Sequence, residues 1–246
     1  MPKNIVSIYR IIMSMVLMTT TGSVALILKW ISFGASTKFG TKYIIAPSSR
    51  LILLLAGVQY KLPRRSVYPN RQVMYTFNHN SYLDVLILTA MGIPNTRFFL
   101  SETTFKFIHL TISAMAIGVH YIPMKSDPAR RAKFFKEVEK DIMQSGHSVF
   151  VSSEGVHEFI HGIAPFNRGV YHMAMNCGMD IQLVYLDVPK KMNALNDYKF
   201  NNGTVEAYLM EFISTKDWSL DVLDDKIDSI RERFLKEYSL KNDLHS

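Results

Sequence analysis

The chain of 246 residues contains one cysteine, Cys177, so no internal disulfide can form. One thiol is also too few for a zinc site built from several thiolates. Both absences are typical of a protein that faces a reducing compartment. The sequence has no Walker pattern and no dinucleotide-binding glycine pattern, which argues against a nucleotide cofactor. We therefore expect no cofactor and no metal ion.

Acidic residues are missing from the first third of the chain. Residues 1–83 contain ten Lys or Arg and no Asp or Glu, and Asp84 is the first acid. A basic segment binds either nucleic acid or anionic lipid, and its apolar content decides between them. Because long apolar runs separate these charges, the sequence favours an anionic membrane surface and argues against nucleic acid.

The longest apolar run extends from Ile11 to Leu28 and is uncharged over 18 residues, with Arg10 and Lys29 at its ends. This length is just enough to cross a bilayer. No convincing small-residue cleavage site follows, so we interpret the run as an uncleaved anchor that either spans the membrane or inserts partway. A second apolar stretch, 43–58, is interrupted by Pro47 and predicts an interfacial helix. Residues 1–65 are thus predicted to anchor the protein in the membrane.

From Arg71 onward, short β-rich runs alternate with helix-like runs. This alternation predicts an α/β domain over residues 66–246, with a mixed, largely parallel sheet flanked by helices. The interval 193–202 has no clear pattern. The predicted strands are 73–78, 97–100, 119–124, 148–151 and 181–188, and the predicted helices are 81–91, 103–117, 127–144, 168–176 and an amphipathic C-terminal helix over 218–238.

Residues 127–144 are predicted to form a helix that begins with an Asp127-Pro128 cap and first turn. The helical period places its apolar side chains on one face. That predicted face consists of Phe134, Phe135, Val138, Ile142 and Met143.

The stretch 75–88, YTFNHNSYLDVLIL, contains our candidate reaction centre, His79 and Asp84. A neutral imidazole accepts a proton from a hydroxyl group during attack on a carbonyl, and a carboxylate on its other nitrogen fixes the tautomer. A structural interpretation is also available, because Ser81 and Asp84 have the spacing of a capping box. The two roles are compatible, since a cap at Ser81 places Asp84 in the first turn of the helix.

Two further segments follow predicted strands or open predicted helices. Glu154 and Gly155 come directly after a strand, and Arg168 lies at a helix N-terminus, which attracts anions. Taken alone, both segments are ordinary loops. Because ligand sites in such folds lie beyond strand ends, we expect His79 and Glu154 to converge on one crevice.

With these motifs in hand, residues 70–190 resemble the glycerolipid acyltransferase family. NHNSYLD at 78–84 is similar to the family's NHxxxxD box, SEGVH at 153–157 to its EGTR box, FNRG at 166–169 to its basic-glycine segment, and GVHYIPMK at 118–125 to a strand that normally ends in Arg. The resemblance implies that His79 is the catalytic base and Asp84 its orienting partner. It implies substrate-binding positions at Asn78, Ser81, Lys125, Glu154, Gly155, His157 and Arg168.

The sequence departs from the family pattern at four positions. His157 replaces the Arg of the EGTR box, and Ser153 replaces the Pro before its Glu. Met124 or Lys125 stands where a strand-terminal Arg is expected, and Leu183 where a Pro is expected. In the family those arginines are associated with the phosphate of the acyl acceptor. The departures therefore affect the acceptor more than the catalytic chemistry.

The resemblance implies an enzyme that moves an acyl group from acyl-CoA or acyl carrier protein to a lipid hydroxyl, with lysophosphatidic acid as the favoured acceptor. The catalytic domain would lie on the cytoplasmic side of a membrane. Three alternatives remain: an acyltransferase for a hydroxyl acceptor without phosphate, a membrane-surface adaptor without activity, and a zinc peptidase. The last rests on His157-Glu158-Phe159-Ile160-His161, an H-E-x-x-H match between glycines that leave little room for a helix.

Overall fold

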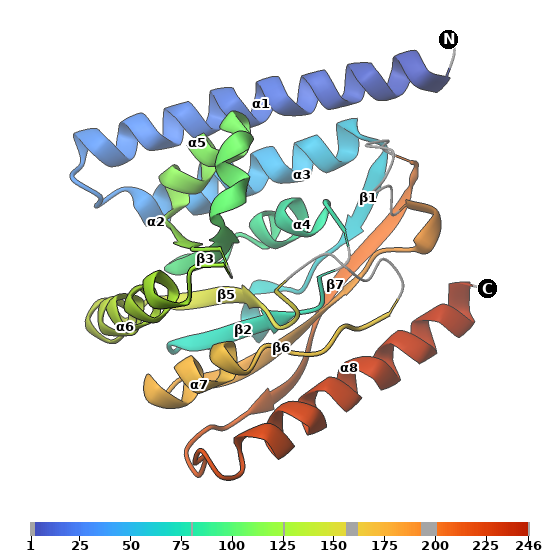
Figure 1. The fold of residues 1–246 in the computed structure, drawn as a ribbon. Coiled ribbons are helices and arrows are strands. Elements are labelled where there is room, and N and C mark those ends of the chain that lie inside the picture. Colours follow the sequence, from blue (N-terminus) through green and yellow to red (C-terminus); the bar gives the residue numbers. More distant parts are fainter. Residues whose placement is uncertain (1–2, 80, 125, 156–161, 193–200, 246) are drawn as a thin grey trace.

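The described residues of this computed structural model, 3–79, 81–124, 126–155, 162–192 and 201–245, form a seven-stranded sheet flanked by helices (Figure 1). The strand order across the sheet is β1-β7-β6-β2-β5-β3-β4. The strands are β1 (Val58–Lys61), β2 (Val73–Phe77), β3 (Thr96–Ser101), β4 (Val119–Ile122), β5 (Ser148–Ser152), β6 (Asp180–Asp187) and β7 (Gly203–Ile213).

The strands β2 to β6 all run in one direction, and β7 and β1 run against them. Phe77 is paired with Ser152 of β5 on one side and with Val184 of β6 on the other, so three carboxyl ends meet at one edge. The central strand β2 is buried along its whole length, as expected for a parallel strand covered on both faces. The predicted mixed, largely parallel α/β sheet is confirmed.

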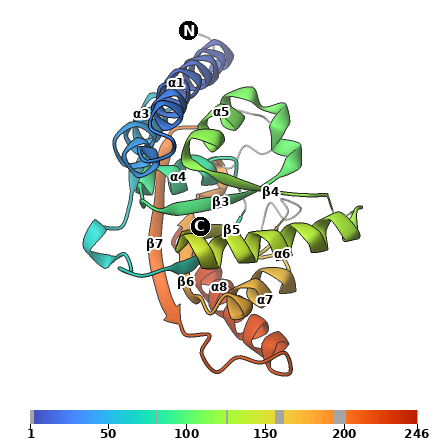
Figure 2. The same cartoon turned by 90° about the vertical axis from the view of Figure 1, so that its left-hand side faces the viewer.

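Each face of the sheet has its own apolar core and its own helices. One core contains Tyr75 and Phe150 with side chains of α3 and α4, and the other contains Met74 and Phe234 with side chains of α6, α7 and α8. Figure 2 shows these two helical layers on opposite sides of the sheet. The helices are α1 (Lys3–Ile31), α2 (Thr37–Gly40), α3 (Ala46–Leu55), α4 (Asp84–Met91), α5 (Ile108–Ile117), α6 (Pro128–Ser145), α7 (Arg168–Asn176) and α8 (Leu223–His245), with a π-helical turn at Thr41–Ile45 and 3-10 turns at Arg65–Val67, Glu102–Lys106 and Lys190–Met192.

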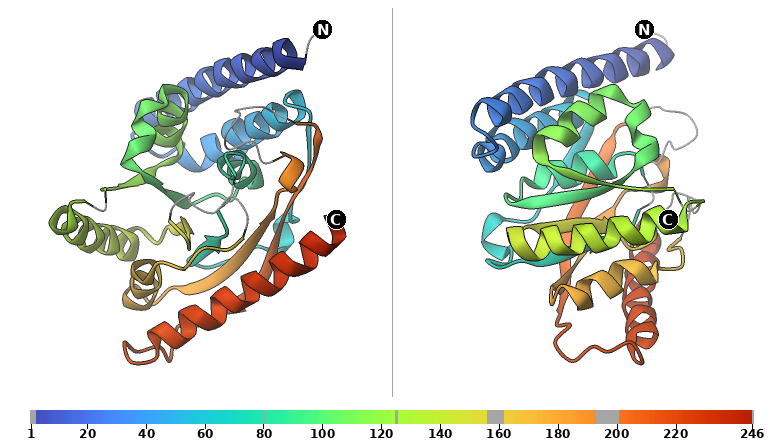
Figure 3. Two further views of the ribbon diagram at one scale, coloured as in Figure 1. Left: turned by 45° about the vertical axis from the view of Figure 1, so that its right-hand side comes forward. Right: turned by 60° about the vertical axis from the view of Figure 1, so that its left-hand side comes forward.

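Helix α1 forms an outer layer over α3 and α5 and lies along the α/β domain rather than projecting from it (Figures 1 and 3). The segment Val6–Ile31 is long and apolar enough to cross a membrane, by length and composition. Both of its ends are bonded to the rest of the chain. Arg10 Nη1 donates to Asn202 Oδ1 at 2.8 Å, and Lys29 Nζ donates to the Met115 carbonyl at 2.6 Å.

Two strands were not predicted from the sequence. Strand β7 lies in the stretch after 202 to which no element was assigned, and Val58, predicted as the end of an interfacial helix, instead opens β1. The π-helical turn Thr41–Ile45 continues directly into α3, and Pro47 lies in the first turn of α3, so the proline does not end the helical stretch. Because β1 pairs with β7, the region 1–65 contributes an edge strand to the sheet of the region that follows.

Three predicted helices have different limits or faces. The stretch 103–117 is divided into a 3-10 turn and α5, and α5 buries only one face, since Ile108 is exposed. On α6, Val138 and Ile142 are buried but Met143 is exposed, because it lies 100° beyond Ile142 around the helix. The Asp127 cap is confirmed, since its carboxylate accepts the Arg130 N–H at 3.0 Å. Helix α8 begins at Leu223 rather than 218, after a turn, and continues to His245.

Candidate active site

His79 and Asp84 face each other at the carboxyl edge of the sheet, between the end of β2 and the start of α4. His79 Nδ1 lies 2.8 Å from Asp84 Oδ2. The Asp84 side chain is completely buried, whereas the His79 side chain is 17% exposed. An ionised carboxylate only accepts, so Nδ1 carries the proton and Nε2 becomes the basic nitrogen of the neutral ring. This is the arrangement that a general base requires.

The same Asp84 carboxylate also shapes the start of α4. Its Oδ2 accepts the Ser81 backbone N–H at 3.1 Å, and Ser81 Oγ accepts the Leu83 N–H at 3.1 Å. The helix begins at Asp84 and not at Ser81, so the predicted helix start is wrong. The predicted reach of the acid back to the Ser81 backbone is confirmed. Asp84 therefore holds the turn and the imidazole with one oxygen atom.

Glu154 converges on His79 from the neighbouring strand β5, as predicted. Its Oε1 accepts the backbone N–H of His79 at 2.9 Å, and its Oε2 accepts the backbone N–H of Ala164 at 2.8 Å. The side chain is almost fully buried. Burial raises the pKa of this carboxyl, and the two N–H donors partly oppose that rise. Glu154 thus connects the backbone of His79, after β2, to the backbone of Ala164, in the chain that follows β5.

Gly155 has a backbone conformation that few other residues adopt, with φ at +70°. A Cβ at this position would lie 2.2 Å from Asn167 Nδ2. Asn167 Nδ2 in turn donates to the Glu154 carbonyl at 2.7 Å. Sequence reasoning did not single out Asn167, although it lies inside the FNRG segment. Glycine is needed here so that the FNRG segment approaches the glutamate.

Asn78 was predicted to bind substrate, but both ends of its side chain contact the protein backbone. Oδ1 accepts the Leu186 N–H at 2.8 Å, and Nδ2 donates to the Leu186 carbonyl at 2.9 Å. The side chain is completely buried. Asn78 therefore ties the end of β2 to β6 directly beneath His79. Ser81 is likewise buried and contributes to the turn before α4.

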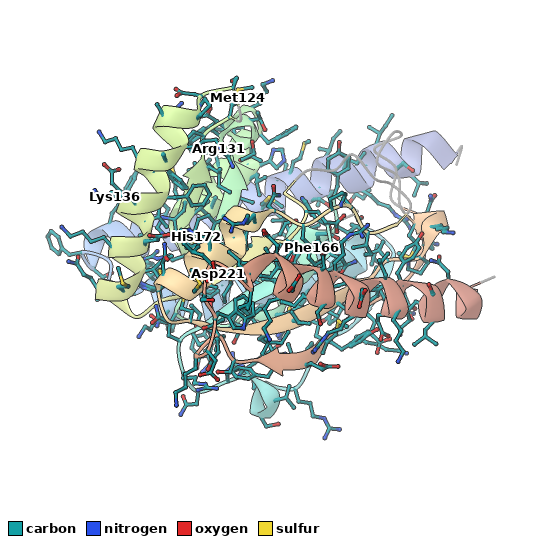
Figure 4. All side chains as sticks on the ribbon, turned by 60° about the horizontal axis from the view of Figure 1, so that its bottom comes forward. Met124, Arg131, Lys136, Phe166, His172 and Asp221 are labelled. Carbon is teal, nitrogen blue, oxygen red and sulfur yellow. The ribbon has the colours of Figure 1, made fainter. Side chains whose placement is uncertain are left out.

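Arg168 is not brought together with His79 by any contact of the described residues. It is the first residue of α7, and its Nε lies 2.7 Å from Asp224 Oδ1 at the start of α8. Both side chains are more than half exposed, so this ion pair contributes little to stability. The nearby Phe166, labelled beside α8 in Figure 4, packs edge-on against Phe234 of that helix, with ring centroids 5.5 Å apart.

Two predicted substrate-binding residues, Lys125 and His157, lie outside the described residues, as does the H-E-x-x-H match at 157–161. Met124, the residue before Lys125, does have contacts that the structure describes. Glu102 accepts the Met124 N–H at 3.0 Å with one oxygen and contacts Arg130 at 2.8 Å with the other. Glu102 thus connects Met124 to the first turn of α6.

The structure thus shows an α/β protein with a paired histidine and aspartate, His79 and Asp84, at the carboxyl edge of a largely parallel sheet. Residues 60–187, more than half of the chain, match the family model described as Acyltransferase. The protein belongs to this family, and the resemblance to glycerolipid acyltransferases stated from its motifs is confirmed.

Individual relatives agree with this assignment. The chain is 19% identical over 186 residues to a 1-acyl-sn-glycerol-3-phosphate acyltransferase of Limnanthes douglasii, covering 76% of this chain and 66% of that protein. It is 27% identical over 139 residues to the chloroplastic BAT2 enzyme of Brassica napus, described in the same words, covering 55% of this chain and 39% of that protein. The chain thus spans slightly less than two thirds of the first relative's length.

A solved structure shows the same fold. The crystal structure of the 1-acyl-sn-glycerophosphate (LPA) acyltransferase PlsC from Thermotoga maritima superposes with a TM-score of 0.77 over 96% of both chains. The sequences are 14% identical, so this similarity concerns the fold alone.

Proposed function

We propose that the protein transfers a fatty acyl group from an acyl thioester to the hydroxyl group of lysophosphatidic acid, giving phosphatidic acid. The observation that supports this most directly is the His79–Asp84 pair, with 2.8 Å between Nδ1 and Oδ2, in a chain of the acyltransferase family. The Limnanthes douglasii and Brassica napus enzymes are both named for this class of acceptor. Glu154 supports the proposal further, because it fixes the backbone of the base.

In the proposed reaction, the hydroxyl oxygen of lysophosphatidic acid attacks the thioester carbonyl carbon. His79 Nε2 takes up the proton of that hydroxyl group during the attack. The tetrahedral intermediate collapses with cleavage of the carbon–sulfur bond, and the imidazolium returns the proton to the departing thiolate. Asp84 stabilises the imidazolium between these two steps. The base acts directly on the acceptor, so no covalent acyl-enzyme is required. Acyl-CoA and acyl carrier protein present the same thioester, and both are proposed donors.

The acceptor proposal predicts a preference for a phosphate group. Hydrogen bonds to charged groups typically contribute about 1.5 to 3 kcal/mol, so lysophosphatidic acid should have a kcat/KM about tenfold or more above that of the matching monoacylglycerol. The measurement is initial-rate kinetics with both acceptors and one acyl-CoA. Equal kcat/KM values would favour the alternative of a hydroxyl acceptor without phosphate. Absence of turnover with either would favour a non-catalytic adaptor.

We also propose that α1 and α3 rest on a membrane, with the catalytic domain on the cytoplasmic side. The outward faces of these helices are apolar, and the charges of residues 1–83 are all basic. The contacts at both ends of α1 favour a helix that lies in the interface over one that leaves the domain to cross the bilayer. The exposed apolar side chains are Ile8, Tyr9, Ile12, Met15, Val16, Val24, Ile27, Leu28, Trp30 and Ile31 of α1 and Leu51, Leu54 and Leu55 of α3.

Removing exposed apolar side chains of α1 should release the protein from membranes. A fully buried aliphatic side chain contributes about 1.5 to 3 kcal/mol, so the triple variant Val16→Ser, Ile27→Ser, Ile31→Ser should weaken partitioning at least about tenfold. Sedimentation with anionic vesicles measures this, and high salt should not release the unmodified protein. The matched control is Leu220→Ser with Leu240→Ser, which removes exposed apolar side chains near and in α8. Equal loss of binding in both variants would contradict the assignment.

A further inference from the structure

A cavity lies at the opposite edge of the sheet from His79. It is open to solvent, has a volume of about 360 Å³ and is lined by the last turns of α1 and α5, residues of β3 and β4, and Asp141 of α6. Arg97 and Gly118 lie at the amino ends of β3 and β4, where Phe98 pairs with Val119. His79 follows the carboxyl end of β2, so this cavity is separate from the proposed active site.

Two cations line this cavity and are fixed by backbone carbonyls. Arg97 Nη1 donates to the Ile117 carbonyl at 3.2 Å, and Lys29 Nζ donates to the Met115 carbonyl at 2.6 Å. Each of these groups has further N–H donors. A Cβ on Gly118 would lie 1.4 Å from Arg97 Nη1, so glycine leaves the space that the guanidinium occupies. The cations therefore belong to a site with defined geometry and are not simply solvated.

His120 adds a third potential donor. Its Nε2 is buried and has no hydrogen-bond partner among the described residues, and the nearest acid, Asp141 Oδ2, is 3.6 Å away. Burial lowers the pKa of this imidazole, whereas Asp141 raises it and Arg97 and His147 lower it further. Among the lining residues that the structure describes, Asp141 is the one carboxylate, and its side chain is more than half exposed. Two basic side chains and the buried imidazole nitrogen of His120 thus face one acid, Asp141.

The mouth of the cavity joins an exposed apolar surface. Trp30 lines the cavity, and the residues that follow it include Ile31 and the almost completely exposed Phe33. Met115 of α5 also lines the cavity and is exposed. Tryptophan next to basic residues is typical of the boundary between lipid headgroups and acyl chains. A ligand that fits the basic cavity and the apolar surface beside it has an anionic headgroup and apolar chains.

We propose that this cavity binds the phosphate of an anionic phospholipid, with Lys29, Arg97 and His120 as its donors and the acyl chains along Trp30 and Ile31. The site is distinct from the one that would bind the acyl acceptor. It places a specific lipid contact at the end of α1, next to the helices proposed to rest on the membrane. Its occupancy does not depend on acyl transfer, so the proposal stands or falls separately from the proposed function.

The two tryptophans of the chain, Trp30 and Trp218, provide a local probe. In a Trp218→Phe background, Trp30 fluorescence is titrated with monomeric dihexanoylphosphatidylglycerol, which is neither the proposed acceptor nor its product. We expect a saturable blue shift. Lys29→Gln and Arg97→Gln should each raise the apparent Kd about tenfold, the usual effect of removing a charge-assisted hydrogen bond. The matched control is Lys136→Gln, which removes an exposed charge of α6 outside the cavity.

Asp141→Asn provides a variant with the opposite sign, because it removes the one acid of the lining and should tighten binding. If Arg97→Gln fails to fold, Asp141→Asn and Lys29→Gln, which lies on the outer helix α1, still test the proposal. Dihexanoylphosphatidylcholine, which has no net charge, should not saturate the signal, and inorganic phosphate should bind more weakly than the lipid. The proposal is overturned by weaker binding to Asp141→Asn, by equal losses in Lys29→Gln and Lys136→Gln, or by inorganic phosphate that binds as tightly as the lipid.

Discussion

Replacing His79 by alanine is expected to lower kcat for acyl transfer by about two to four orders of magnitude, the usual contribution of a general base. The fold should survive the change. The bond that joins residue 79 to Glu154 comes from the backbone N–H, which alanine retains. The lost imidazole contacts include the Phe77 ring at 5.8 Å and the Asp84 carboxylate. Steady-state kinetics with circular dichroism separate loss of the base from loss of the fold.

The matched control is His172→Ala on α7, which removes a second imidazole on the opposite face of the sheet. Its ring contacts Asn176 and plays no part in the proposed site. It should turn over at nearly the normal rate. A folded His79→Ala variant with near-normal kcat would refute the mechanism, whatever the acceptor.

Asp84→Asn should cause a smaller but clear loss of kcat. The amide oxygen is still able to accept the Ser81 N–H, so the turn before α4 has a substitute partner. The amide is neutral, however, and no longer stabilises an imidazolium or requires Nδ1 to be the donor. A loss in kcat with little change in melting temperature would therefore separate the orienting role of Asp84 from its capping role.

The sequence predicted those elements whose limits are determined by residues close to them in the chain. The limits of α7 were predicted to the residue, and the cap of α6 was correct, because an Asp-Pro pair and a following glycine fix a helix locally. Strand β1 is different. It is four residues long, lies at the sheet edge, and owes its conformation to β7, which begins at Gly203. No local signal in residues 58–61 indicates a partner so distant in the chain.

Strand β7 was missed for another reason, since its sequence does alternate. Val205, Ala207 and Leu209 face one core, while Tyr208 and Met210 face the other. This pattern is typical of a strand, but it follows an interval without clear structure and was not recognised.

The candidate site shows the same division between local and long-range information. The spacing of His79 and Asp84 indicated their pairing, because both lie within one turn of the chain. The opposite is true of Asn78, whose partner Leu186 is 108 residues away. From the sequence, Asn78 was grouped with the substrate-binding residues, and only the structure shows both ends of its amide bonded to β6. Arg168 likewise has a partner, Asp224, that its motif did not predict.

Replacing Glu154 by alanine is expected to reduce both stability and turnover. The change leaves the part-buried N–H of His79 and the buried N–H of Ala164 without their acceptor, and the buried one alone costs about 1 to 3 kcal/mol. Because the loop of the base loses its support, the imidazole is no longer held at the reacting hydroxyl. A misplacement of about 1 Å commonly costs about a hundredfold in rate, so kcat should fall by that order while KM changes little.

Two further variants distinguish positioning of the base from general loosening of the loop. Glu154→Gln keeps one acceptor oxygen but presents an amide NH2 to the other N–H, so its kcat should lie between those of the wild type and Glu154→Ala. Tyr171→Phe is the matched control, because it removes only the hydroxyl that donates to Ser153 Oγ at 2.9 Å, next to Glu154 and away from His79. It should lower the melting temperature and leave kcat nearly unchanged. If Tyr171→Phe loses turnover in proportion to stability, as Glu154→Ala does, then Glu154 supports the loop in general and does not position the base.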